Sequence, residues 1–173
     1  MDSFDSYIKT INESLSLKNL PRLEAMMSPA TFSDFVGNFM IHAISDNCSH
    51  VTKNLYHNGH PDLIPTDHYE GNSCQYGDLG IEVKASKHAK GWQGHNPEAI
   101  FLLVFTYEIP LDGEFTFTKV MGAQLEKTDW KFYGRNETSR RTPTASVLAS
   151  GQAKLEENWI WRLYGNTIPL CEE

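Results

Sequence analysis

The chain contains few cysteines. Cys48, Cys74 and Cys171 form an odd, irregularly spaced set, which argues against a disulfide framework and indicates a reducing compartment. Neither a Cys-x2-Cys nor a His-x3-His spacing is present, only the looser Cys48-x-His50 and His57-x2-His60 pairs. These features disfavour a disulfide-stapled secreted domain and a structural zinc module.

Long apolar segments are also missing. The longest apolar run is Ala99–Phe105, far shorter than the roughly 20 residues that cross a bilayer as a helix. The N-terminus, MDSFDSYIKT, lacks the basic start and apolar core of a signal peptide. At 173 residues, with 40% hydrophobic and 21% charged residues, the composition is typical of one soluble globular domain. We therefore expect a cytoplasmic protein with no membrane partner.

Positive charge is scarce overall but unevenly distributed. The formal net charge is −7, yet residues 127–154 hold six basic and two acidic side chains, so this segment carries +4 and the remainder −11. A basic region on an acidic body suits docking on phosphate, and it suits a solvated loop equally well.

The first 45 residues show helical periodicity. Phe4, Ile8, Ile11 and Leu15 belong to an apolar stripe that predicts a first helix, and a short helical turn is expected after Pro21. Residues 28 and 29 form a Ser-Pro N-cap and start signal, so the sequence predicts a helix over 29–45 with an apolar face in the core. On this helix, Asp34 is expected to point away from that face, toward solvent.

Strand signals dominate the rest of the chain. Strands are predicted over residues 60–65, 79–86, 99–109 and 114–120, the last two forming a hairpin, and a further strand over 158–163. Residues 46–58 look polar and irregular, and 129–157 are expected to form a basic segment with a turn around 142–146. Together these elements predict an α/β (α+β) fold, a single domain covering residues 1–173.

The predicted strand around residue 83 carries unusual charges. With the period of two in a strand, Glu82 and Lys84 project from one face, while Ile81, Val83 and Ala85 project from the other. Removing a carboxylate and an ammonium from water costs several kcal/mol each unless they are paired. A strand chosen for stability alone would not carry them, which indicates that they serve a function.

Asp62 lies in the preceding apolar segment, with 19 residues between it and Glu82. Two converging carboxylates can hold Mg²⁺, a hard cation that keeps coordinated water. A neighbouring lysine can contact a scissile phosphate and orient the attacking water. Asp62, Glu82 and Lys84 therefore supply the groups that metal-dependent phosphodiester hydrolysis needs.

Pro61-Asp62 followed by Glu82-Val83-Lys84 resembles the Pro-Asp…(Asp/Glu)-x-Lys motif of the restriction-endonuclease-like nucleases. The resemblance implies a mixed central β-sheet flanked by helices, with a helical part at 1–45, a catalytic sheet at about 59–125 and a basic DNA-contacting region at about 127–157. It further implies Mg²⁺ held by Asp62, Glu82 and the Val83 carbonyl, with Lys84 as the catalytic lysine. No nucleotide cofactor is implied.

Two accessory residues are candidates. Many members of that superfamily carry another acidic residue on the leading helix. Here Asp34 is expected to face the wrong way and Glu24 precedes the helix predicted over 29–45, so neither is assigned that place, and Glu24 is an accessory candidate only. His60, close to Asp62, either touches the site or caps a strand.

Polar side chains after Lys84 and in the basic region are candidate DNA contacts, although the same residues would suit an exposed polar loop. The candidates are Ser86, Lys87, His88, Lys90, Gln93, His95, Asn96, Lys131, Arg135, Asn136, Arg140 and Arg141.

The small size of the chain resembles an orthodox Type II restriction endonuclease, which implies a homodimer that cuts double-stranded DNA at a specific sequence with Mg²⁺. A structure-specific DNA repair or recombination nuclease is an alternative. In a third interpretation, the chain is a non-catalytic DNA- or protein-binding module, and Glu82 and Lys84 form only a structural pair.

Overall fold

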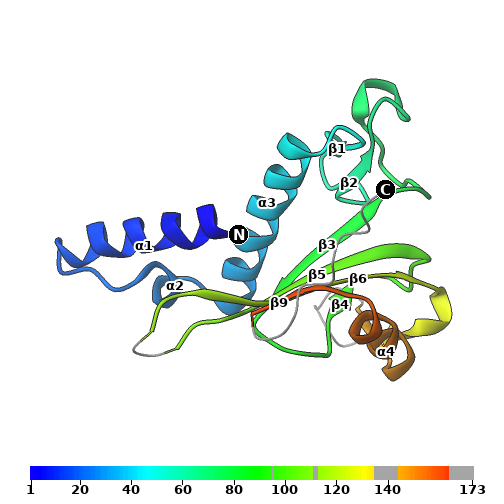
Figure 1. Cartoon of the computed structure of the whole chain (residues 1–173). Helices are drawn as coiled ribbons and strands as arrows, with labels where there is room; N and C mark the ends of the chain where they lie inside the picture. The colour runs from blue at the N-terminus through cyan, green and yellow to red at the C-terminus, as the bar shows by residue number, and fades with distance from the viewer. Residues whose placement is uncertain (95, 111–112, 135–143, 164–173) are drawn as a thin grey trace.

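A computed structural model describes residues 1–94, 96–110, 113–134 and 144–163 of the chain (Figure 1). Its helices are α1 (Asp2–Ser16), α2 (Leu23–Met26), α3 (Pro29–Asn47) and α4 (Ala149–Glu157), with short 3₁₀ helices η1 (Glu70–Asn72) and η2 (Lys127–Asp129). Its strands are β1 (Val51–Lys53), β2 (Leu63–Pro65), β3 (Ile81–Ser86), β4 (Gln93–Gly94), β5 (Ile100–Glu108), β6 (Thr116–Leu125), β7 (Trp130–Phe132), β8 (Ala145–Val147) and β9 (Trp159–Arg162).

Two sheets organise these strands. The larger has the order β1-β2-β3-β5-β6-β9, and the smaller has the order β4-β8-β7. In the larger sheet β3 and β5 are parallel, whereas the other neighbours are antiparallel. A mixed α and β architecture with a mixed central sheet flanked by helices is therefore confirmed, as is the hairpin between β5 and β6.

Strand β5 separates two apolar clusters. Leu103 and Phe105 belong to a cluster that includes side chains of α1 and α3, whereas Leu102 and Val104 belong to a second cluster, which includes Leu155 of α4. Alternate side chains of a strand point to opposite faces. The continuous apolar run in this strand is explained by burial on both of those faces.

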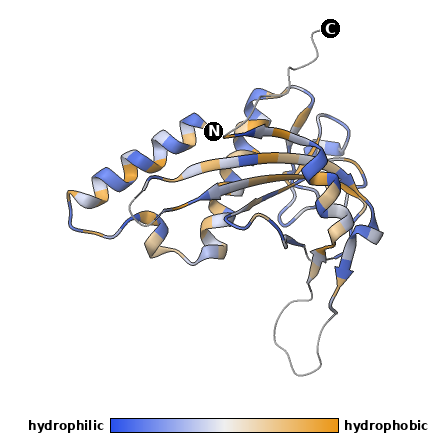
Figure 2. Ribbon diagram, turned by 60° about the horizontal axis from the view of Figure 1, so that its bottom comes forward, coloured by the Kyte–Doolittle hydropathy of each residue, from blue (hydrophilic) through white to orange (hydrophobic). Residues whose placement is uncertain are grey.

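Helix α3 forms where its start signal predicts. The Ser28 hydroxyl accepts a hydrogen bond from the Thr31 N–H at 3.2 Å, and Pro29 occupies the first turn. Phe32, Val36 and Met40 are buried in the cluster that includes α1. Along the ribbon of α1, hydrophilic and hydrophobic residues alternate (Figure 2), which fits a helix with one face against the core.

The described part of the segment 129–157 contains elements that the prediction of a basic region with a turn did not include: β7, β8 and α4. Residues 135–143, which include the start of the predicted turn, lie outside the described residues. Helix α4 is short, and its periodicity is interrupted by Gly151, where a Cβ would lie 2.8 Å from Val147 Cγ1. Leu155 of this helix is fully buried. Close tertiary packing therefore stabilises α4 although its sequence shows only weak helical periodicity. Strand β1 within the predicted irregular segment 46–58 was also missed, since it spans only Val51–Lys53.

Among the described helices, none combines the length and the apolar character that a membrane span requires.

Candidate functional site

Asp62 is brought to strand β3 by the antiparallel pairing of β2 with β3, in which Leu63 lies opposite Ile81. One Asp62 carboxylate oxygen, Oδ2, accepts a hydrogen bond from the Val83 N–H at 2.9 Å. Gly80 permits this approach: its φ is +144°, and a Cβ there would lie 2.3 Å from the Leu63 carbonyl oxygen. The two halves of the predicted motif therefore meet through backbone pairing.

Asn54 fixes the backbone around Asp62. Its buried side-chain amide donates to the Pro61 carbonyl at 3.0 Å and to the Cys74 carbonyl at 2.7 Å. Its side-chain oxygen accepts from the N–H groups of Tyr56 and Cys74 at 3.1 and 3.0 Å, and its own N–H donates to the Asp62 carbonyl at 2.9 Å. No local sequence pattern indicates this role, because the bonds join residues up to 20 positions apart.

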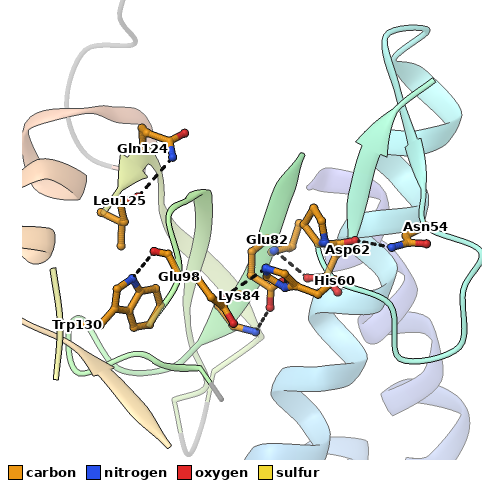
Figure 3. Close-up of polar contacts among 11 residues, drawn as sticks. Asn54, His60, Asp62, Glu82, Lys84, Glu98, Gln124, Leu125 and Trp130 are labelled. Carbon is orange, nitrogen blue, oxygen red and sulfur yellow. Dashed lines mark hydrogen bonds and ion pairs between the residues drawn. The ribbon is translucent and has the colours of Figure 1, made fainter. Parts of the chain in front are cut away.

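Glu82 lies at the centre of a charged cluster (Figure 3) and is 9% exposed. Its Oε1 accepts from the Lys84 ammonium at 2.5 Å, and its Oε2 lies 2.9 Å from His60 Nδ1. His60 Nε2 in turn lies 3.7 Å from a carboxylate oxygen of Glu98. The structure therefore brings His60, the accessory candidate, into contact with the predicted catalytic residues.

Glu98 is a member of this cluster that the sequence prediction omitted. It lies two residues before the start of β5, which runs parallel to β3 with Phe101 opposite Ile81. Its carbonyl accepts a hydrogen bond from the Trp130 indole at 2.9 Å, which ties the smaller sheet to the cluster (Figure 3). In the sequence, Glu98 is marked only by its position just before an apolar strand. That position does not place Glu98 near Glu82 unless the order of the strands in the sheet is known.

The two carboxylates have opposite pKa shifts. Burial, together with the charge of Glu82, raises the pKa of Asp62 from 3.8 to about 6, against the opposing effect of Lys84. Burial also acts to raise the pKa of Glu82, but the His60 hydrogen bond and the Lys84 charge outweigh it and lower that pKa. For Lys84, burial is outweighed by Glu82 and Asp62, so its pKa is raised. The protein therefore compensates the negative charge of Asp62 less fully than that of Glu82. A bound cation would supply the missing positive charge.

We expect Asp62→Asn to increase the free energy of unfolding by about 2 kcal/mol at pH 8. The folded-state pKa of Asp62 lies above the unfolded value of 3.8, so the ionised carboxylate destabilises the fold above about pH 6. Below about pH 4 the carboxyl group is protonated in both states, and the gain should vanish. Urea unfolding without metal at several pH values measures this difference.

Glu82→Gln is the matched control with the opposite sign. The folded-state pKa of Glu82 is lowered, so its ionised form stabilises the fold above the unfolded pKa of about 4.5, and this stability is lost as the pH falls through the folded value. We expect Glu82→Gln to destabilise the protein at pH 8. If Asp62→Asn and Glu82→Gln changed the free energy of unfolding equally at every pH, the inferred pKa shifts of the two carboxylates would be contradicted.

Asp62 and Glu82 have the chemistry of a magnesium site. Mg²⁺ is often bound by only one or two carboxylates and completes its coordination with water. Across residues 1–94, 96–110, 113–134 and 144–163, no group of three or more His, Cys, Asp or Glu side chains is arranged to hold a metal ion. Asp62 and Glu82 are the residues that could hold a partly hydrated ion, and binding through Glu82 would displace a contact from Lys84 or His60. The Val83 carbonyl as a further ligand stays a prediction.

The chain matches no protein-family model, no curated protein and no solved structure. Its function is therefore inferred from the geometry and chemistry of this cluster.

A hollow of about 250 Å³ borders the cluster between β3 and α3. Asp62 and Lys84 line it on one side, and Asp34 and Asn38 line it from the helix. Asp34 is exposed as predicted, but the expectation that it points away from the site is wrong. The apolar periodicity of α3 identifies its buried face, and it cannot reveal that the polar face borders the hollow.

A groove of about 630 Å³ adjoins this hollow at Lys84 and Asp34. Ser86, His88 and Gln93 line it, so three of the candidate DNA contacts lie directly beside the charged cluster. The Ser86 hydroxyl also accepts a hydrogen bond from the His88 N–H at 3.0 Å, which fixes the start of the segment after β3.

The remaining candidate contacts are less closely connected with the cluster. Lys87, Lys90 and Asn96 are exposed, and the Lys131 ammonium lies 5.2 Å from the centre of the Tyr133 ring. Candidates outside the described residues are His95, Arg135, Asn136, Arg140 and Arg141.

Glu24 is not placed at the site. Its carboxylate pairs with Arg22 at 2.8 Å and accepts from the Asn12 amide at 2.9 Å. It therefore connects α1 with α2, and the expectation that it is an accessory residue of the site is wrong. Asp34 lies nearer to the site, since it lines the same hollow as Asp62.

Proposed function

We propose that the chain is a Mg²⁺-dependent endodeoxyribonuclease that hydrolyses phosphodiester bonds of double-stranded DNA. The observation that carries this proposal is the position of the Asp62 carboxylate, bonded at 2.9 Å to the backbone of the strand that holds Glu82 and Lys84. Asp62 and Lys84 thus line the same hollow, and the Glu82 carboxylate holds the Lys84 ammonium at 2.5 Å. This combination suits charge stabilisation at a phosphoryl group.

Each of these side chains has a distinct role in the proposed reaction. Asp62 and Glu82 would hold the ion, which supplies a polarised phosphate and a coordinated water when bound. Lys84 would stabilise negative charge on the scissile phosphate and orient the attacking water. His60 holds Glu82 from the side opposite to Lys84, so it is a positioning residue for that carboxylate.

We also propose that the sheet is a restriction-endonuclease-like core. Three features support this assignment: Asp62 directly precedes β2, the adjacent β3 carries Glu82-Val83-Lys84, and α3 precedes both strands and lines the hollow beside them. A sequence-specific enzyme of the Type II restriction class is the favoured form. It would act as a homodimer, since two copies most simply cut both strands of a two-fold symmetric site.

A non-catalytic DNA- or protein-binding module is the second candidate. The observation in its favour is that both Glu82 oxygens already have protein partners, Lys84 and His60. In that case the cluster would be a buried ion-pair network with a structural role. Binding would then survive substitution of Lys84, and cleavage would be absent in the parent protein.

Cleavage of unmethylated plasmid DNA with Mg²⁺, with and without EDTA, tests the proposal. We expect discrete fragments with Mg²⁺ and intact plasmid with EDTA, because Asp62 requires a cation for full charge compensation. Discrete fragments would identify a sequence-specific enzyme, whereas cleavage restricted to mismatches or junctions would identify the repair or recombination alternative. DNA binding without cleavage of any of these substrates would favour the binding module.

A further inference from the structure

A third hollow extends the groove beyond Asp62. It has a volume of about 440 Å³, and residues 53–59 line it together with Asn38, Ile41 and Asp62. Asn38, Ile41 and Asp62 also line the hollow between β3 and α3. That hollow in turn shares Asp34 and Lys84 with the groove beside Ser86. The three hollows therefore adjoin one another along α3, with Asp62 and Lys84 near the middle.

Gly37 lies in the helical wall of the central hollow. Glycine in the middle of a helix destabilises that helix relative to alanine. Packing within the protein does not explain it here, because a Cβ on Gly37 would meet no heavy atom within 4 Å. The space above its backbone is open to the hollow, and an absent side chain allows a ligand to approach the helix closely.

The side chains around the third hollow suit an anion. Lys53 and His57 line it with the amides of Asn38 and Asn58, and Asp62 at the boundary is the only acidic residue in its lining. Lysine and amide donors are common partners of nucleic-acid phosphates. The aromatic ring of Tyr56, 42% exposed, lies in the same wall and could stack on a base.

The length of the combined groove suits several nucleotides. Its lining residues on α3 extend from Ala30 to Ile41, about 16 Å at the rise of an α-helix. One strand of a duplex advances roughly 3.4 Å per nucleotide, so this distance corresponds to about five nucleotides.

We propose that residues 53–59 and the Gly37 surface of α3 form a second arm of the substrate groove. This arm binds the sugar-phosphate backbone of the nucleic acid on the side of the cut opposite to Ser86, His88 and Gln93. The proposal rests on the proposed function and extends it, because it assigns the substrate path on both sides of the cluster. Lys53 is its phosphate-binding residue, and Gly37 allows the strand to approach.

Lys53→Ala tests the charge in this arm. The dissociation constant of a labelled DNA duplex, measured by fluorescence anisotropy in EDTA over a range of salt concentrations, should rise about threefold to tenfold. The slope of log affinity against log salt should decrease in magnitude by about one, as expected for one lost phosphate contact. Lys9→Ala is the matched control, since Lys9 is exposed on α1 and pairs with Glu114. It should leave both quantities unchanged.

Gly37→Ala tests the open space. The variant should melt at a higher temperature than the parent, because alanine stabilises a helix, yet bind the duplex roughly tenfold more weakly, because its methyl group enters the groove. Ser6→Ala, at an exposed position of α1, is the control that should raise stability without changing affinity. A lower melting temperature for Gly37→Ala would contradict the inference that the space above the Gly37 backbone is open.

The two proposals fail in distinguishable ways. If the parent cleaves DNA while Lys53→Ala and Gly37→Ala bind like their controls, the second arm is rejected and the nuclease stands. If the parent binds DNA through Lys53 and Gly37 but never cleaves it, the groove stands and the nuclease is rejected. A parent that binds no DNA rejects both.

Discussion

Lys84→Met should reduce magnesium-dependent DNA cleavage by about 10³-fold while leaving the protein folded. Methionine keeps much of the length of the side chain, but it removes the ammonium that Glu82 holds at 2.5 Å beside the hollow. The loss of one preorganised group that stabilises transition-state charge costs roughly 10²–10³ in rate, and Lys84 would also orient the attacking water. Cleavage rates at saturating Mg²⁺, with the melting temperature of each variant, measure the effect.

Lys119→Met is the matched control for this substitution. Lys119 forms an ion pair with Glu156 at 2.6 Å, and its side chain is 26% exposed, close to the 29% of Lys84. It is absent from the lining of the hollows beside Asp62 and Lys84. We expect Lys119→Met to retain cleavage within about twofold, since surface ion pairs contribute less than about 1 kcal/mol. Equal activity in the Lys84 and Lys119 variants would reject the catalytic role of Lys84.

Asn54→Ala should lower the free energy of unfolding by about 3 kcal/mol. The substitution leaves the carbonyls of Pro61 and Cys74 and the N–H groups of Tyr56 and Cys74 without their hydrogen-bond partner. Partly buried groups of this kind lose stability when their partners are removed. Chemical denaturation at pH 7 measures the change, and cleavage should also decrease because the segment that positions Asp62 is loosened.

Asn47→Ala provides the comparison for this effect. Asn47 is exposed near the end of α3, and its side-chain amide donates to the Ala43 carbonyl at 2.8 Å. We expect a loss of less than about 0.5 kcal/mol, because water can replace this partner. A similar loss for Asn54→Ala would mean that Asn54 does not fix the loop.

Local signals in the sequence predicted much of the fold. The Ser28-Pro29 start of α3, the apolar run of β5 and the strand pattern of β6 each depend on neighbours in the chain, and the structure forms all three elements. Helix α4 and strand β1 were missed, because the first is stabilised by packing around Gly151 and the second is three residues long. Propensity is a weak guide where tertiary contacts decide the outcome.

The same distinction applies to the candidate site. Asp62, Glu82 and Lys84 were predictable because the charges of the latter two interrupt an apolar strand, and the structure brings all three together. Asn54 and Glu98 were not, since their positions depend on the pairing of β2 with β3 and of β3 with β5. The orientation of Asp34 likewise depends on which elements surround the polar face of α3.

In the proposed nuclease, the parallel pairing of β3 with β5 would separate the residues of the reaction from those that contact the target. Because the two strands run in the same direction, the chain between them must cross over and return, and its ends are fixed by hydrogen bonds in the sheet. His88 and Gln93 lie on this crossover and line the groove, whereas Glu82 and Lys84 lie on the sheet itself. If the chain is the proposed nuclease, substitutions at exposed positions of this crossover would alter DNA preference while Glu82 and Lys84 keep their positions in the sheet, a division that would favour the evolution of new specificities.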